Sequence, residues 1–120
     1  MFVGAADPAD EIQMVAIPRC DGYMYAIGDS MTPDFNDGDI VFYKTVSGRR
    51  DGLIFGEPYV LVYREDSRQH VVIRYVERSD RPGHYRLISL NPKYEPVEIP
   101  VDCIRRMALI KATIRYNNIG

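Results

Sequence analysis

Ser30 is the side chain most able to do covalent chemistry in this sequence of 120 residues. It lies in the run 28–33, which reads Gly-Asp-Ser-Met-Thr-Pro, and Gly38 and Asp39 follow soon after. A serine hydroxyl becomes a nucleophile only when a general base lies within hydrogen-bond reach. The alternative for Ser30 is a turn residue that bonds the local backbone.

The elements around Ser30 predict a turn between two strands. Residues 23–27 are aromatic and apolar, which favours a strand, and residues 40–46 indicate the next one. Gly28 permits a positive φ or a close backbone approach, and Pro33 fixes φ and donates no hydrogen bond. Residues 37–39, Asp-Gly-Asp, form a second turn signal, and we expect Asp39 to bond backbone N–H groups there.

These residues resemble a known family, the serine-lysine autopeptidases of LexA- and CI-type repressor C-terminal domains (peptidase family S24). The matching positions are Gly28, Asp29, Ser30, Met31, Pro33, Gly38 and Asp39. A second matching segment is Leu87-Ile88-Ser89 followed by Asn91-Pro92-x-Tyr94. The resemblance extends over roughly residues 23–114, and it implies that Ser30 corresponds to the nucleophile.

The expected fold is mainly β, with short strands separated by turns. The resemblance implies a curled antiparallel sheet that is partly barrel-like. Residues 59–63 and 71–76 predict an antiparallel pair around a turn at 65–68, and strands are also expected at 85–90 and 97–99. Residues 107–116 fit a helix or a strand, and the resemblance implies a strand.

We expect three regions along the chain. Residues 1–19 form a flexible lead-in and a first strand, 20–116 form the S24-like β domain, and 117–120 are a frayed tail. In the resembling family the lead-in contains the bond that is cut during self-cleavage, often Ala-Gly. Ala5-Ala6 is the nearest candidate here, and a simple linker is the alternative.

Arg74 is the main departure from the family pattern. The resembling family has a lysine on this later strand that takes the proton from the serine, whereas residues 71–76 read Val-Val-Ile-Arg-Tyr-Val. A general base must lose its proton near the working pH, which an arginine in a protein does not do. Arg74 could bond Ser30 or neutralise Asp29 or Asp39, because a buried guanidinium needs a partner.

Another lysine would have to replace the missing base. The chain has three lysines, Lys44, Lys93 and Lys111, and none matches the family position. The sequence therefore predicts a family member whose peptidase machinery is degenerate.

Composition limits the classes of function. The formal net charge is −2, which argues against direct binding of nucleic acid, since phosphate contacts need a basic patch. Cys20 and Cys103 have no metal-ligand spacing and do not cluster with the two histidines, so we expect reduced cysteines, a cytoplasmic protein, and neither metal nor cofactor. No apolar run approaches the roughly 18 residues that would predict a membrane span.

These features predict a dimerisation and regulatory domain of a CI- or LexA-like transcriptional repressor, without peptidase activity. We expect a homodimer that meets operator DNA only through a helix-turn-helix domain, which this sequence does not contain. Two alternatives remain: an active self-cleaving peptidase that uses Ser30, and an accessory subunit of the UmuD type.

Overall fold

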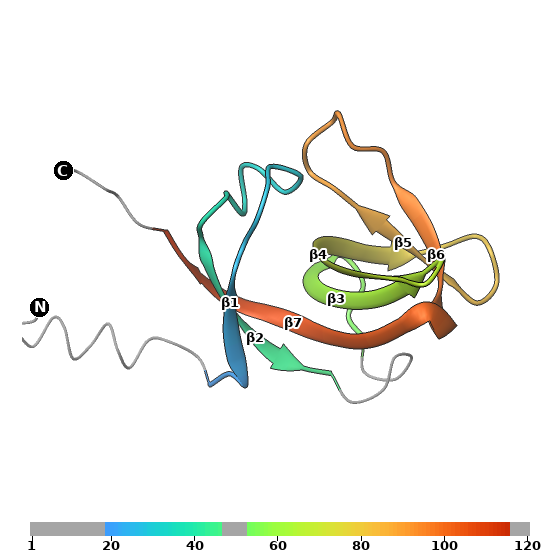
Figure 1. Cartoon of the computed structure of the whole chain (residues 1–120), viewed down its shortest axis with the longest axis horizontal. Helices are drawn as coiled ribbons and strands as arrows, with labels where there is room; N and C mark the ends of the chain where they lie inside the picture. Colours follow the sequence, from blue (N-terminus) through green and yellow to red (C-terminus); the bar gives the residue numbers. More distant parts are fainter. Residues whose placement is uncertain (1–18, 47–52, 116–120) are drawn as a thin grey trace, which may run out of the picture.

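The computed structural model describes residues 19–46 and 53–115, which form a mainly β fold (Figure 1). The elements in chain order are β1 (Gly22–Tyr25), β2 (Ile40–Thr45), β3 (Glu57–Glu65), β4 (Arg68–Arg78), β5 (His84–Ile88), β6 (Val97–Pro100), the 3₁₀ turn η1 (Val101–Cys103) and β7 (Ile104–Ile114). Most strands differ by one or two residues at their ends from the sequence-based expectation. The mainly β prediction is confirmed.

All seven strands belong to one antiparallel sheet with the order β1-β2-β7-β3-β4-β5-β6. The last strand of the chain, β7, lies in the middle and pairs with β2 on one side and β3 on the other. Figure 1 shows that β7 runs across the molecule and that the sheet curls around it. The predicted curled antiparallel sheet is confirmed, and the sheet does not close into a barrel because β1 and β6 remain at its two edges.

The hairpin of β3 and β4 is longer than predicted. Its two central turn residues, Asp66 and Ser67, have φ values of 52° and 64°, which is the pattern of a type I′ turn. This turn matches the twist of the flanking strands, so the pairing continues from the turn to Glu57 and Val76. The hairpin places Arg74 on β4, directly opposite Tyr59 of β3.

Strand β7 settles the ambiguity between helix and strand near the C-terminus. It begins at Ile104, before the segment 107–116 whose conformation the sequence left open, and it is extended throughout. Met107 and Ala108 are adjacent and both buried, yet they pack in two different hydrophobic clusters. Side chains of neighbouring residues point to opposite faces in a strand, as these two do. Pairing with β2 on one side and β3 on the other stabilises the extended conformation here.

The core consists of two hydrophobic clusters. The first contains Tyr59, Leu61, Val76, Tyr85, Leu87, Ile99, Val101, Ile104 and Met107. The second contains Ala26, Met31, Phe35, Val41, Val60, Ile73 and Ala108. Because Leu61 and Val60 are neighbours on β3 and belong to different clusters, both faces of the middle of the sheet are covered. The second cluster packs against the segment that contains Ser30.

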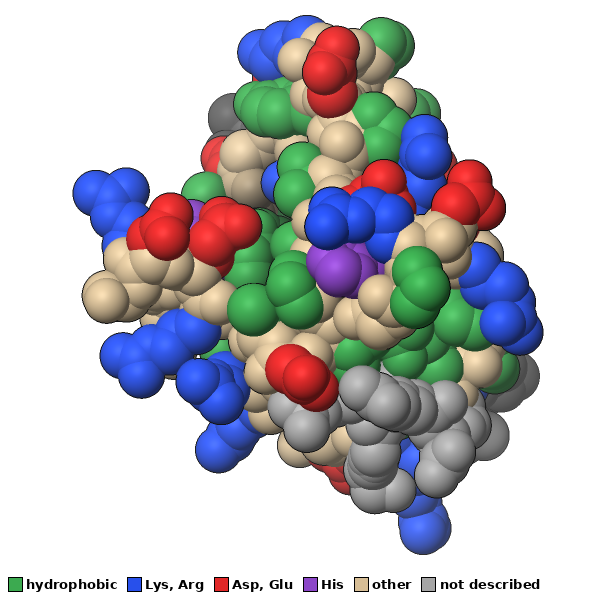
Figure 2. Space-filling model, turned by 90° about the vertical axis from the view of Figure 1, so that its right-hand side faces the viewer, with side chains coloured by type: hydrophobic (Ala, Val, Ile, Leu, Met, Phe, Trp, Pro, Cys, Tyr) green, Lys and Arg blue, Asp and Glu red, His purple; other side chains and the backbone are tan. Residues whose placement is uncertain are grey.

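Other predictions concern residues outside the described part. The first strand and lead-in, the Ala5-Ala6 bond and the tail at 117–120 all lie there. In the described residues, no helix is long and apolar enough to cross a membrane, and no three His, Cys, Asp or Glu side chains gather as metal ligands would. Figure 2 shows positive and negative side chains interspersed over one end of the molecule.

Candidate functional site

The segment between β1 and β2 holds Ser30 in a series of tight turns. Gly28 and Gly38 have φ values of 86° and 89°, which L side chains rarely adopt. The Gly28 N–H donates a hydrogen bond of 2.9 Å to Asp37 Oδ1, which ties the two turns together. Of the two roles that the sequence allows for Gly28, a positive φ and a close backbone approach, the structure shows the positive φ. The peptide bond between Thr32 and Pro33 is cis.

Two apolar side chains attach this segment to the core. Met31 and Phe35 are 3% and 7% exposed and pack in the second cluster with Ile73 of β4. The Phe35 N–H also donates to the Met31 carbonyl at 2.9 Å. Ser30 is therefore next to a buried anchor, which fixes its backbone against β4.

Asp39 is the one charged side chain that is fully buried in the described residues, at 2% exposed. Its Oδ2 accepts a hydrogen bond of 2.8 Å from the Asn36 N–H, as predicted for a residue that bonds turn backbone. Arg115 also binds it through Nε and Nη2, with Nη2 to Oδ2 at 3.0 Å. These bonds from Arg115 hold the pKa of the Asp39 carboxyl below its ordinary value.

Asp29 is held by the second of the two segments that resemble the family. Tyr94 donates its hydroxyl to Asp29 Oδ1 at 2.6 Å, and Lys93 Nζ lies 3.0 Å from Oδ2. The bond from Tyr94, followed by that from Lys93, lowers the pKa of the Asp29 carboxyl. The Asn91 N–H donates to the Ser30 carbonyl at 3.0 Å, and its side-chain amide donates to the Asp29 carbonyl at 3.1 Å. The two segments thus form one unit in space.

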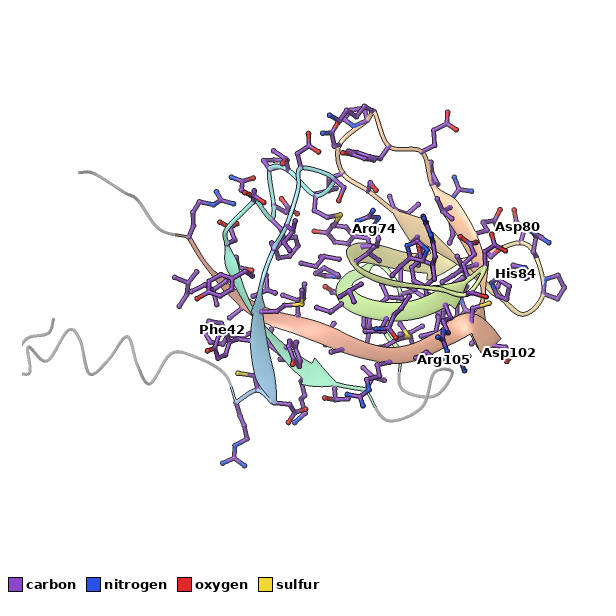
Figure 3. The ribbon with its side chains drawn as sticks, viewed as in Figure 1. Phe42, Arg74, Asp80, His84, Asp102 and Arg105 are labelled. Carbon is purple, nitrogen blue, oxygen red and sulfur yellow. The ribbon has the colours of Figure 1, made fainter. Side chains whose placement is uncertain are left out.

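Arg74 contacts Ser30 directly. Its Nη1 donates a hydrogen bond of 2.8 Å to Ser30 Oγ and another of 2.7 Å to the Ile73 carbonyl. Figure 3 shows Arg74 on β4, on the side that faces the segment between β1 and β2. Of the three partners considered for Arg74 from the sequence, Ser30 is the one found, since Asp29 and Asp39 bind other residues.

The guanidinium of Arg74 is half-buried. Burial lowers the pKa of Arg74 relative to its ordinary value, because desolvation disfavours the charged form. An arginine nevertheless stays protonated in a protein, so its nitrogens only donate hydrogen bonds. Ser30 Oγ is consequently an acceptor in this contact.

The three lysines lie elsewhere. Lys93 pairs with Asp29, and this hydrogen bond raises the pKa of Lys93, which is the opposite of what a general base requires. Lys44 on β2 and Lys111 on β7 are exposed. Within the described residues, Ser30 Oγ has no hydrogen bond with any of these three amines.

A cleft of about 170 Å³ opens beside Ser30 and Arg74. Its other walls are mostly apolar: Met24, Ala26, Ile27, Gly28, Met31, Phe35, Val71, Val72 and Ile73. The sequence identified Gly28, Ser30, Met31 and Arg74 but not the part of β4 before Arg74. This part of β4 lies beside the Ser30 segment because Ile73 packs in the same cluster as Met31 and Arg74 bonds Ser30.

Several contacts of the site were not foreseen. Arg115 follows β7 directly and reaches Asp39, and Tyr75 donates its hydroxyl to Asp34 Oδ2. Burial, followed by this bond, raises the pKa of Tyr75 to about 12. No local pattern in the sequence predicts these two pairs. The Asn-Pro-x-Tyr segment, by contrast, could be identified from the sequence because it resembles a segment of the family.

Comparison with known proteins bears on the family. A search of curated proteins gave no match. The family model described as Peptidase S24-like matches residues 8–111, which include Ser30, Arg74 and the segment at 91–94. This match agrees with the resemblance found in the two segments. Because it extends over most of the sequence, the chain belongs to the Peptidase S24-like family.

Proposed function

We propose that this chain is the dimerisation and regulatory domain of a CI- or LexA-like transcriptional repressor and that it does not cleave peptide bonds. The observation that supports this most strongly is the hydrogen bond of 2.8 Å from Arg74 to Ser30 Oγ. In this proposal, Arg74 occupies the position of the lysine that is the general base in the family. The family match supports a protein of the LexA, CI and UmuD kind in general.

The chemistry of the contact argues against a nucleophilic Ser30. Activation of a hydroxyl requires a group that accepts its proton. Arg74 instead donates a hydrogen bond to the Ser30 oxygen and cannot accept its proton, so this contact supplies no base to activate the hydroxyl. Lys93 cannot replace the base while it is paired with Asp29, because its pKa is raised there.

Regulation by association is supported by apolar side chains outside the core. Tyr23 and Tyr25 on β1 are 61% and 56% exposed, and Tyr23 packs beside Phe42 with a ring-centroid distance of 6.2 Å. Tyr25 on β1 pairs with Ile40 on β2, and Ile40 pairs with Ile114 on β7. These side chains therefore form one apolar patch with Tyr23 and Phe42 across β1, β2 and β7. A homodimer would bring paired helix-turn-helix domains to a two-fold symmetric operator.

A time course of intact mass at pH 7 and pH 10 tests the absence of cleavage. The unmodified chain would be compared with Arg74→Lys, Ser30→Ala and the matched control Arg68→Lys on the same strand. We expect a shortened product only with Arg74→Lys, since a lysine can lose its proton at alkaline pH. A shortened product from the unmodified chain that Ser30→Ala abolishes would contradict the proposal.

The self-cleaving peptidase is the second candidate function. It is favoured by one observation, the position of Ser30 at the wall of an open cleft with a buried anchor beside it. The same time course decides between the two functions.

Sedimentation equilibrium tests the dimer separately. A species of twice the chain mass is expected at micromolar concentration, and its dissociation constant should rise when Tyr23 and Tyr25 are both replaced by serine. A monomer throughout the concentration range would contradict the dimerisation role without affecting the conclusion on cleavage.

A further inference from the structure

A second cavity, of about 320 Å³, lies on the sheet outside the site described above, and Ser30 is not part of its wall. Its floor consists of small apolar side chains on three adjacent strands. Val60 pairs with Ala108 of β7, and Val62 pairs with Val71 of β4. Val60 and Ala108 are 7% and 8% exposed. Because these side chains are short, they leave a hollow above the sheet whose floor is buried.

Tyr43 of β2 forms one wall of this cavity, because its partner on β1 has no side chain. Gly22 pairs with Tyr43, and a Cβ at Gly22 would lie 2.6 Å from the Tyr43 hydroxyl oxygen. The ring of Tyr43 can therefore pack over the backbone of β1. Met24 of β1 and Met107 of β7 also line the cavity. The walls and the floor together suit the apolar part of a small ligand.

Arg106 brings a positive charge to the opening of this cavity. It lines the cavity beside Val62, with which it pairs, and it is exposed. Its guanidinium takes no part in the hydrogen bonds and ion pairs that side chains form among residues 19–46 and 53–115. A guanidinium can bind a carboxylate through two parallel N–H groups. A carboxylate that enters the cavity would therefore find a partner that is available.

Asp21 brings the opposite charge to the same opening. Its Oδ2 accepts a hydrogen bond of 2.7 Å from the Thr45 N–H, and this bond lowers the pKa of the Asp21 carboxyl. The side chain is therefore a carboxylate at neutral pH. Asp21 and Arg106 both line the cavity, yet these two described side chains do not pair with each other. A ligand that has both a positive and a negative group could bind both of them.

We propose that this cavity binds a free α-amino acid with an aliphatic side chain, such as leucine. Its carboxylate binds Arg106, its ammonium group binds Asp21, and its side chain packs on the floor at Val60 and Ala108. A free amino acid has both charges at one end and its apolar group at the other. This matches two exposed charged residues above a buried apolar floor. The inference goes beyond the proposed function, because it does not depend on whether Ser30 is reactive.

Three analogues of L-leucine test the site, since each lacks one feature that the proposal uses. The analogue 4-methylpentanoate lacks the ammonium group, leucinamide lacks the carboxylate, and L-alanine lacks the branched side chain. Each compound is titrated into the isotope-labelled full chain at pH 7 and low salt, and binding is followed by backbone amide shifts. We expect L-leucine to bind at least about tenfold more tightly than each analogue, as a charge-assisted hydrogen bond or three buried carbons would provide. The shifts should map to residues 21–24, 43–45, 60–62 and 106–108.

Two substitutions assign the charges of the ligand to their partners. Arg106→Gln should remove the preference for leucine over leucinamide. Arg105→Gln is the matched control, because Arg105 is an exposed neighbour on β7 that does not line the cavity. Asp21→Asn should remove the preference for leucine over 4-methylpentanoate, while the side-chain oxygen of asparagine can still accept the bond from Thr45.

An analogue that binds as tightly as leucine would overturn the inference, and so would the absence of shifts with millimolar leucine. A preference that survives Arg106→Gln, or shifts confined to the Ser30 segment, would also overturn it. Arg106 and Asp21 are exposed, so both variants should fold. The comparison of ligands on the unmodified chain decides even without them. Cleavage is measured separately by intact mass, so either proposal can fail while the other stands.

Discussion

Arg74 Nη1 donates a hydrogen bond of 2.8 Å to Ser30 Oγ, although the two residues are 44 positions apart in the sequence. The contact forms at the point where β5 stops pairing with β4, so the side chain of Arg74 can reach the segment between β1 and β2. Arg74 lies on the same face of β4 as Val72 and Val76, which pack with the first cluster. Met31, next to Ser30, packs with the second cluster. The pair therefore joins the two sides of the sheet at the edge of β4.

Ser30 should not react with a fluorophosphonate probe of serine nucleophiles. The hydroxyl has a hydrogen-bond donor beside it where catalysis would need an acceptor. In Arg74→Lys, labelling should appear and should increase with pH as the amine loses its proton. Mass spectrometry of the labelled protein measures this, with Arg68→Lys as the matched control. Labelling of the unmodified chain at Ser30 would show that another base is present.

Tyr94→Phe should loosen the Ser30 segment without unfolding the domain. The change removes the hydrogen bond of 2.6 Å to Asp29 Oδ1 and leaves the ring in place. We expect a lower urea midpoint and faster hydrogen exchange of the Asn91 N–H, which donates to the Ser30 carbonyl. Glu95→Gln is the control, because Glu95 is an exposed neighbour of Tyr94 in the same loop. Equal midpoints and exchange rates for the two variants would show that the Asp29 contact does not hold the segment.

Met31→Ala should destabilise the domain by about 2 to 5 kcal/mol, the usual cost of removing a buried methionine side chain. Met31 is 3% exposed and joins the Ser30 segment to Ile73. Met31→Leu keeps most of the volume and should cost less than about 1.5 kcal/mol. Urea unfolding gives these free energies, and Thr32→Ala, at an exposed neighbour, serves as the control. Similar values for Met31→Ala and Thr32→Ala would contradict the anchoring role.

The sequence predicted the fold well because most of its signals are local. Alternating residues and turn chemistry mark the hairpin of β3 and β4, and the Asp66-Ser67 turn then sets its register. For β7 the local pattern was ambiguous, since burial on both faces removes the simple alternation that identifies a strand. Only the pairing with β2 and β3, which is not local, determines that this segment is extended.

The candidate site was predictable in part. Gly28 and Pro33 mark the turn around Ser30, and the resemblance identified Arg74 and the segment at 91–94. The contact between Asp39 and Arg115 joins residues 76 positions apart, and no pattern around either residue indicates it. Such contacts depend on which strands become neighbours, here β2 and β7, and on how far each side chain reaches beyond the strand end.

The ion pair between Asp39 and Arg115 should make stability depend on acid pH. Because the pKa of Asp39 is lowered in the folded state, its contribution is complete above the ordinary value of 3.8 and is lost as the pH falls toward the folded value. Asp39→Asn should lower the free energy of unfolding at pH 7 by roughly 1 kcal/mol, after allowance for solvent screening of the half-exposed Arg115. The difference from the unmodified chain should shrink as the pH falls below 3.8 toward the lowered folded pKa, where the native carboxylate becomes protonated. Urea unfolding at pH 7, 5 and 3 measures this, with Asp80→Asn at an exposed loop position as the control. A difference that stays constant over this range would show that Asp39 acts through its shape and not through its charge.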